Sequence, residues 1–398
     1  METDSSNIFD YEHISEIMTK GVFSTMVKPV GKRCNQNCSY CYYQNADKSI
    51  HSPSEEIMSE NTLEEYIRQY INCQDSESVT FCWHGGEPTI AGLDYFRKAV
   101  ELQKKYSGGK EIINTFQTNG TLINNEWCRF FKENKVLVGL SIDGPAYIHN
   151  GNRKWGGNRS SFDAAYKASR LFHDTGVEFN TLSTINNLSE GKGEEIYLFL
   201  RDVIGSTFMQ FLPVADLAET GSGATQYSVT PEGYGKFLTD IFDIWVKKDV
   251  GEIFVQIFES TLAQLCGYQA GVCTLGEYCS NALTVEHNGD VYPCDHYVSH
   301  ELRLGNIKEQ NLGDIFKEHK RIGFTLAKKT RLSEKCSRCR YSFLCHGECP
   351  KHRFSENGES YLCKGLQNYF EHVEPYMIYM KELLESGLPA SLIKTKAI

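Results

Sequence analysis

The sequence predicts an α/β fold, in which a partial (β/α)6 barrel is followed by a small cysteine-rich domain with a β-hairpin. Between residues 24 and 214, short apolar runs alternate with stretches of helical period, as in a parallel βα series. A segment rich in glycine, serine and threonine follows. Beyond residue 267 the chain is rich in cysteine and has few long apolar runs. We therefore expect a barrel over residues 1–217, a linker with connecting helices over 218–266, and the cysteine-rich domain with a C-terminal helix over 267–398.

The barrel pattern resolves into six strands and the helices between them. The strands are expected at Ser24–Val30, Val79–Trp83, Ile112–Thr118, Leu137–Ile142, Val177–Ile185 and Phe208–Leu212. The helices are expected near Leu63–Asn72, Tyr95–Tyr106, Asn125–Glu133, Phe162–Thr175 and Glu194–Val203. Small or polar clusters such as Gly85-Gly86-Glu87-Pro88 and Thr118-Asn119-Gly120 follow several strands. Since α/β folds bind ligands at the carboxyl ends of their strands, we expect the site at this rim.

The second half of the chain predicts less regular structure. Residues Ala218 to Gly235 are expected to form a long irregular linker, followed by a helix through Trp245. The turn sequence His287-Asn288-Gly289-Asp290 predicts a hairpin between the strands Ala282–Glu286 and Val291–Cys294. A segment with so small a core needs an inorganic group to stabilise it.

Composition excludes several classes of protein. The formal net charge of −10 disfavours nucleic acid as a partner, because no basic stripe is present to neutralise phosphates. The segment Met1–Thr19 lacks the pattern of a signal peptide, and no apolar run is long enough to span a membrane. We therefore expect a cytoplasmic protein. In a reducing compartment, the 15 cysteines should be ligands or redox groups rather than disulfides.

The first cysteine motif, Cys34-x3-Cys38-x2-Cys41, follows the first expected strand. Three thiolates can hold three irons of a cubane and leave the fourth iron open to an exogenous chelator. An amino acid with a free amine and carboxylate, such as the methionine part of S-adenosylmethionine, can occupy that position. The alternative is a zinc knuckle, but no fourth Cys or His follows at a suitable spacing.

The C-terminal region contains eight further candidate ligands, the number that two fully ligated cubanes need. They are Cys273, Cys279, Cys294, Cys336, Cys339, Cys345, Cys349 and Cys363. The spacing alone does not divide them into two groups, and two structural zinc sites are the alternative interpretation. The remaining cysteines are interpreted as small buried hydrophobic residues; they are Cys73, Cys82, Cys128 and Cys266.

The first cysteine motif and the Gly-Gly-Glu-Pro stretch together resemble the signature of the radical S-adenosylmethionine superfamily. That signature has C-x3-C-x-aromatic-C after the first strand and Gly-Gly-Glu-Pro after the second. The C-terminal run C-x2-C-x5-C-x3-C followed by a distant Cys resembles the SPASM-type auxiliary domain. The strings FCWHGGEPTIAGL, FQTNGTLIN, VGLSIDGP, IHNGNRKWGG, MQFLPV, VYPCDHYV and RLGNI most resemble the anaerobic sulfatase-maturating enzymes.

The resemblance implies roles for residues at the matching positions. Tyr40 would lie against the adenine of S-adenosylmethionine, and Gly85, Gly86 and Glu87 would receive its amine. Ser141 and Arg153 would hold the ribose hydroxyls and the carboxylate, and the backbone near Ala215 would meet the adenine. For Arg153 alone, a solvated surface charge is the alternative interpretation. The implied cofactors are S-adenosylmethionine and three [4Fe-4S] clusters. Of the two auxiliary clusters, one would be bound by Cys273, Cys279, Cys294 and Cys349, and the other by Cys336, Cys339, Cys345 and Cys363.

The resemblance also implies an activity: oxidation of a Cys or Ser in a Cys/Ser-x-Pro-x-Arg motif of a sulfatase to Cα-formylglycine. A 5′-deoxyadenosyl radical would abstract hydrogen from Cβ, an electron would leave to an auxiliary cluster, and a reductant such as flavodoxin or ferredoxin would supply electrons. Asp295, next to Cys294, would be the base, and we expect its pKa to be raised by burial and by the charge of the cluster. His84, His296 and Tyr297 are the next candidates.

Two other functions stay open at this stage. One is a SPASM-type maturase that forms crosslinks in a ribosomal peptide, although only 33 residues precede Cys34, which is too few for a leader-binding module. The other is a binding protein stabilised by metal, without turnover.

Overall fold

A single ten-stranded sheet runs through the computed structural model, which describes residues 22–45, 57–156, 159–279 and 281–395. The strand order is β10-β9-β8-β1-β2-β3-β4-β5-β6-β7. The strands are β1 Ser24–Lys28, β2 Ser78–Trp83, β3 Glu111–Thr118, β4 Leu137–Ser141, β5 Phe179–Ile185, β6 Phe208–Pro213, β7 Phe254–Val255, β8 Ala282–Glu286, β9 Asp290–Tyr292 and β10 Gly305–Asn306. The pairs from β8 through β1 to β7 are parallel, and the pairs β8–β9 and β9–β10 are antiparallel. Six consecutive parallel strands confirm the predicted partial barrel.

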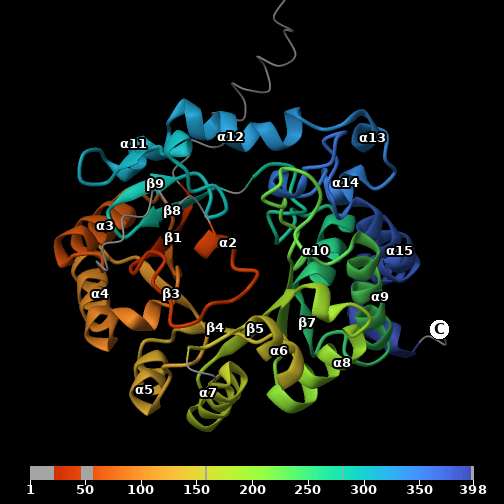
Figure 1. Cartoon of the computed structure of the whole chain (residues 1–398), viewed down its shortest axis with the longest axis horizontal. Coiled ribbons are helices and arrows are strands. Elements are labelled where there is room, and N and C mark those ends of the chain that lie inside the picture. Colours follow the sequence, from red (N-terminus) through yellow and green to blue (C-terminus); the bar gives the residue numbers. More distant parts are fainter. Residues whose placement is uncertain (1–21, 46–56, 157–158, 280, 396–398) are drawn as a thin grey trace, which may run out of the picture.

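The predicted barrel helices are present, and Figure 1 shows them outside the arc of strands. They are α3 Glu60–Asn72, α4 Leu93–Tyr106, α5 Asn125–Glu133, α7 Ser161–Thr175 and α8 Gly193–Leu198, which continues as a wider helical turn over Phe199–Ile204. Local sequence signals fix the ends of these helices. The side chain of Asn124 accepts hydrogen bonds from two free backbone amides in the first turn of α5. Gly176, with φ of +67°, ends α7. The sequence prediction missed two short helices, α2 Tyr42–Asn45 inside the arc and α6 Ala146–Asn152.

Two of the strands that end earlier than predicted stop before a proline, which has no amide hydrogen to continue a ladder. Strand β1 stops at Lys28 before Pro29, and β9 stops at Tyr292 before Pro293. The predicted hairpin turn is confirmed, with Gly289 at φ of +92°. The sequence did not predict that β8 pairs in parallel with β1. This pairing extends the barrel sheet by the strands of the hairpin.

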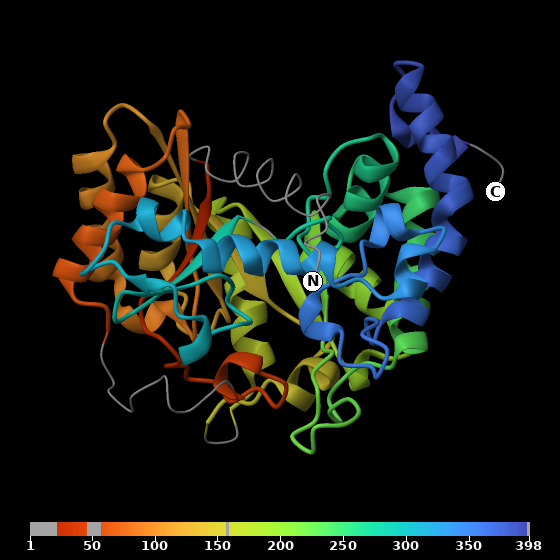
Figure 2. The same cartoon turned by 90° about the horizontal axis from the view of Figure 1, so that it is seen from above.

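The C-terminal half contributes a second group of helices. They are α9 Pro231–Lys248, α10 Gln256–Leu265, α11 Leu312–Phe316, α12 His319–Thr330, α13 Glu334–Ser337, α14 Ser342–Cys345 and α15 Cys363–Glu385. Figures 1 and 2 both show α12 crossing from the hairpin side of the barrel to the C-terminal helices. Short segments between these helices carry most of the C-terminal cysteines. In the part of the chain that the structure describes, no helix combines the length and the apolarity needed to cross a bilayer, and the predicted non-signal segment Met1–Thr19 lies outside it.

The predicted linker ends too late, because α9 already begins at Pro231. Gly235 therefore lies inside a helix, and it is there for packing rather than for chain flexibility. A Cβ at Gly235 would lie 2.5 Å from the carbonyl oxygen of Gly365 in α15, and a Cβ at Gly365 would lie 1.9 Å from the carbonyl oxygen of Pro231. The backbones of α9 and α15 are thus in direct contact two residues after Cys363.

We expect Gly365→Ala to destabilise the protein by about 1–3 kcal/mol, because the added methyl group has no space between the two backbones. Gly323→Ala in α12 is the matched control, since a Cβ there meets no atom within 4 Å. The control should leave stability unchanged or raise it by about 0.5–1 kcal/mol. Thermal denaturation of the iron-loaded proteins measures both changes; equal midpoints for the two variants would contradict the packing argument.

Candidate active site

The three cysteines of the first motif lie together in the loop after β1. All three are partly buried. The backbone amide of Gln36 donates to Sγ of Cys34 at 3.4 Å. Burial, together with the charge of Glu87, raises the pKa of Cys34 to about 12, and the thiols of Cys38 and Cys41 add to this shift. The three thiols therefore lie within electrostatic range of one another, and metal binding would have to displace their protons.

The predicted Gly-Gly-Glu-Pro stretch packs directly against this loop. A Cβ at Gly86 would lie 2.0 Å from the carbonyl oxygen of Arg33, and Gly85 has φ of +120°, so both positions need glycine. The carboxylate of Glu87 is buried and accepts hydrogen bonds from the hydroxyl of Thr118 at 2.8 Å and the amide of Asn119 at 2.7 Å. The Glu87 side chain therefore ties the end of β2 to the end of β3.

Arg153 belongs to a buried polar cluster and is not a solvated surface charge. Its side chain is 9% exposed, and its Nε and Nη2 atoms donate to the two carboxylate oxygens of Asp143 at 3.0 Å each. The hydroxyl of Tyr40 donates to the same carboxylate. Sequence reasoning missed Asp143, although it stands two residues after the predicted Ser141 in the string Ser-Ile-Asp-Gly-Pro.

The other two predicted cofactor residues follow neighbouring strands. The hydroxyl of Ser141, at the end of β4, accepts from the side-chain amide of Gln117 at 3.0 Å. Ala215 is buried just after β6, and the amide before it, that of Val214, donates to the carbonyl of Ile185 in β5. Both residues therefore lie at the carboxyl-terminal rim where the sequence placed the site.

The eight C-terminal thiols fall into two groups. Burial raises the pKa of Cys294, and the thiols of Cys349 and Cys273 add to the shift. Cys279 acts in the same way on Cys349, so these four thiols lie within electrostatic range of one another. The other four line a single cavity with the apolar side chains of Leu366 and Phe370; they are Cys336, Cys339, Cys345 and Cys363. Each group offers the four soft donors that suit an iron–sulfur cluster.

Asp295 lies between the first cysteine loop and the first group of C-terminal thiols. Its carboxylate accepts a hydrogen bond from the hydroxyl of Tyr42, which follows Cys41, and another at 3.7 Å from the thiol of Cys294. Sequence reasoning did not identify Tyr42, whose ring stacks on His296 with centroids 4.2 Å apart. The only indication of Tyr42 in the sequence was its position as an aromatic residue directly after the first cysteine motif.

The expectation of a raised pKa for Asp295 concerns the cluster-loaded protein and stays a prediction. In the protein chain alone, burial raises the pKa of this carboxyl, whereas His296, Lys28 and the hydrogen bond from Tyr42 together lower it by more, so it lies below its usual range. These contacts favour the ionised carboxylate, which is the form that can accept a proton.

The reserve candidates for a base lie nearby. Burial lowers the pKa of His84 and of His296 to about 4 each, so both imidazoles are neutral at neutral pH. Burial raises the pKa of Tyr297, whose ring packs edge-on against Phe324. Of the three, the histidines are in the protonation state that a base requires.

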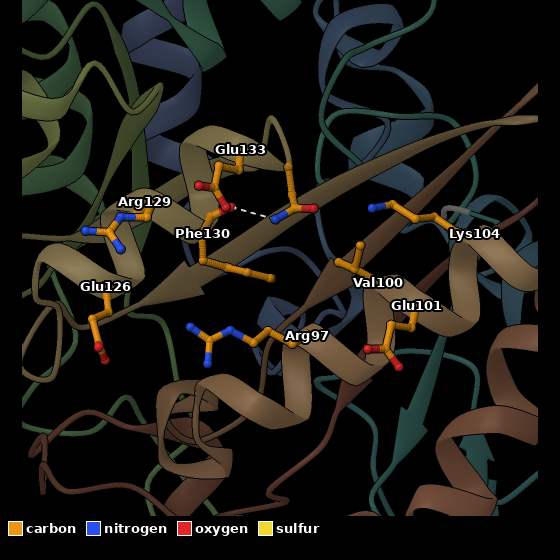
Figure 3. A pocket seen from close by; sticks show the side chains of 9 residues that line it. Arg97, Val100, Glu101, Lys104, Glu126, Arg129, Phe130 and Glu133 are labelled. Carbon is orange, nitrogen blue, oxygen red and sulfur yellow. Dashed lines mark hydrogen bonds between the residues drawn. The ribbon is translucent and has the colours of Figure 1, made fainter.

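Figure 3 shows a pocket on the outer side of the barrel, between α4 and α5. Its lining is mostly charged and of both signs, and it includes Arg97, Glu101, Lys104, Glu126 and Arg129. None of the predicted site residues lines this pocket, so it is not part of the candidate active site.

Comparison with known proteins identifies the same two regions. The radical SAM superfamily matches residues 29–200, and an iron–sulfur cluster-binding domain, SPASM, matches residues 273–340. The serine-type anaerobic sulfatase-maturating enzyme of Bacteroides thetaiotaomicron is 44% identical, covering 93% of this chain and 94% of that protein. The cysteine-type enzyme of Clostridium perfringens is 33% identical, covering 89% of this chain and 97% of that protein.

Solved structures are also similar to this chain over most of its length. A structure described as native anSMEcpe with bound AdoMet and Cp18Cys peptide superposes with a TM-score of 0.83 at 33% identity, covering 91% of this chain and 99% of that one. The SuiB protein of Streptococcus suis, at 17% identity and a TM-score of 0.61, shares the fold. The resemblance recognised in the sequence is thereby confirmed. With such identity over nearly all of its length, the chain belongs to the anaerobic sulfatase-maturating enzyme family of radical S-adenosylmethionine enzymes.

Proposed function

We propose that this protein oxidises a Cys or Ser side chain within a Cys/Ser-x-Pro-x-Arg motif of a sulfatase to Cα-formylglycine. The observation that carries the proposal is the position of Asp295, whose carboxylate accepts from Tyr42 beside the first cysteine loop and stands next to Cys294 in the C-terminal group. Family membership supports it, since the relatives named above are serine-type and cysteine-type sulfatase-maturating enzymes.

The proposed cofactors are three [4Fe-4S] clusters and S-adenosylmethionine. Cys34, Cys38 and Cys41 hold the first cluster and leave one iron for S-adenosylmethionine. Two groups of four cysteines hold the others: Cys273, Cys279, Cys294 and Cys349, and then Cys336, Cys339, Cys345 and Cys363. The cavity lined by the last four thiols supports this division. Tyr40, Gly85, Gly86, Glu87, Ser141, Arg153 and Ala215 form the binding site for S-adenosylmethionine.

When bound, these groups supply a 5′-deoxyadenosyl radical that removes a hydrogen atom from the substrate Cβ, and a site that takes up the second electron. The protein's own part is to remove the remaining proton. Asp295 accepts it from the thiol or hydroxyl of the substrate, while Tyr42 orients the carboxylate. Loss of a hydrogen atom, a proton and an electron leaves a thioaldehyde or an aldehyde, and water converts the former into the aldehyde. A flavodoxin or ferredoxin is the proposed reductant.

Anaerobic incubation with S-adenosylmethionine, a reductant and peptides containing Cys-x-Pro-x-Arg or Ser-x-Pro-x-Arg tests the proposal. We expect mass spectrometry to show an aldehyde at the Cys or Ser position, and the relative yields to give the preferred residue. A peptide with Ala at that position is the control and should stay unmodified. An intramolecular crosslink in place of the aldehyde would contradict the proposal and favour a crosslinking maturase.

Replacing Cys34, Cys38 and Cys41 together by Ala should abolish formation of 5′-deoxyadenosine, because no cluster remains to bind S-adenosylmethionine. Iron content should fall by about one third, since the two C-terminal clusters remain. Cys128→Ala is the control, because Cys128 is buried in the apolar core and belongs to neither group. Continued production of 5′-deoxyadenosine by the triple variant would remove these cysteines from the chemistry.

Asp295→Asn keeps the size and hydrogen-bonding capacity of the side chain but cannot take a proton. The variant should contain wild-type iron and still form 5′-deoxyadenosine, while formylglycine formation falls by about 10²–10⁴-fold. The quantity to measure is the ratio of 5′-deoxyadenosine to modified peptide. Asp295→Glu, which retains a carboxylate, should recover part of the yield. Wild-type yield from Asp295→Asn would shift the role to His84 or His296.

A further inference from the structure

Lys328 in α12 is a fully buried lysine with no part in the proposed proton transfer. Its Nζ atom donates to the backbone carbonyls of Cys273 at 2.6 Å and of Thr274 at 2.9 Å. The guanidinium of Arg353 donates to the carbonyl of Lys328 at 2.8 Å and fixes this part of the helix. Through the two carbonyl contacts, a positive charge lies against the segment that carries Cys273.

The surroundings of Lys328 are the thiols of one proposed cluster. Burial lowers its pKa, whereas Cys279, Glu348, Cys273 and Cys349 act in the opposite direction. The carboxylate of Glu348 is itself held by the imidazole of His352 and the hydroxyl of Ser360, each at 2.9 Å. The groups that face Lys328 are therefore three proposed sulfur ligands, two neutral carbonyls and the carboxylate of Glu348, which is shared with His352 and Ser360.

A buried cation beside a cluster changes how readily the cluster takes an electron. Reduction adds one negative charge, and a nearby positive charge stabilises the reduced state more strongly in a low-dielectric interior than in water. Net charge and hydrogen bonding around the cluster are established determinants of its reduction potential. A lysine in this position should therefore favour the reduced state.

We propose that Lys328 raises the reduction potential of the cluster held by Cys273, Cys279, Cys294 and Cys349, and so makes it a better acceptor for the electron that leaves the substrate. The inference rests on the proposed function through this assignment of ligands. Lys328 is a positioning and charge-supplying residue: it acts on the cluster through its charge and contacts the backbone of one ligand.

The test compares reduction potentials in the full-length chain carrying the triple Cys34, Cys38 and Cys41 to Ala replacement, which leaves the two C-terminal clusters. Lys328→Gln removes the charge and keeps an amide donor for the carbonyls, whereas Lys328→Arg keeps the charge. Lys329→Gln is the matched control, because Lys329 is 35% exposed and pairs with Glu277 at 3.2 Å. Anaerobic titration with dithionite, followed by electron paramagnetic resonance, gives the midpoint potential of each cluster.

We expect Lys328→Gln to shift one of the two signals to a more negative potential and to leave the other in place. Lys328→Arg and Lys329→Gln should titrate like the parent chain. Unchanged potentials in Lys328→Gln would overturn the proposal, as would an equal shift in Lys329→Gln. Loss of one cluster's iron from Lys328→Gln would also overturn it, because the lysine would then only brace the Cys273 segment.

The outcome is separable from the proposed activity, because no substrate is present and formylglycine is not measured. Iron for fewer than two clusters in the parent chain would contradict the ligand assignment, and with it the proposed function, before any variant is compared.

Discussion

The parallel pairing of β1 with β8 determines how the two halves of the site meet. Its register places Lys28 opposite Glu286, and both side chains are buried, with Nζ 3.8 Å from the carboxylate. The same carboxylate accepts from the hydroxyl of Tyr43 at 2.7 Å. Tyr43 follows Tyr42, whose hydroxyl reaches Asp295. A pairing of two strands about 250 residues apart in sequence thus aligns the first cysteine loop with the proposed base. Removing one partner of such a buried ion pair costs about 3–5 kcal/mol, so this register is strongly fixed.

The individual strands and helices of the barrel could be predicted from the sequence, but the pairing of β8 with β1 could not. Apolar periodicity and capping residues such as Asn124 identified the barrel strands and helices within a few residues, because those signals act over short stretches. The pairing of β8 with β1 has no connecting turn and no local signal, and only the folded chain reveals it. The assignment of Gly235 to the irregular linker was wrong for a related reason. A glycine in sequence indicates either a loop or a close contact, and the contact with Gly365 in α15 lies far away in the chain.

The residues of the candidate site were likewise predictable only where their signal is local in the sequence. Spacing was enough to single out the cysteine motifs, because cluster ligands lie close together in sequence in the first loop. It did not divide the C-terminal eight, since Cys349 lies among the cysteines of one group and acts on the other. The influence of Lys28 and Tyr42 on the pKa of Asp295 was not foreseen, because the fold brings both residues to this carboxylate from far away in the sequence. Asp143 and Lys328 were missed because their importance comes from burial beside a charged partner, which single-sequence patterns do not encode.

Buried charge explains why binding of clusters and folding of the C-terminal half should be coupled. The charge of Arg153 is matched by the carboxylate of Asp143 whether or not the thiols are ionised. Lys328 differs, because its hydrogen-bond acceptors are two neutral carbonyls, and burial raises the pKa of the thiols around it, so that the free thiols are uncharged. The carboxylate of Glu348 also acts on Lys328, but it is bonded to His352, so the buried ammonium group is only partly compensated, which is costly. Under the proposed ligand assignment, cluster binding would replace the thiol protons with iron and create negative charge on the sulfurs that face Lys328. The same event that assembles the cluster therefore compensates the lysine, so the packing of α12 against the cysteine segments is most stable in the cluster-loaded protein.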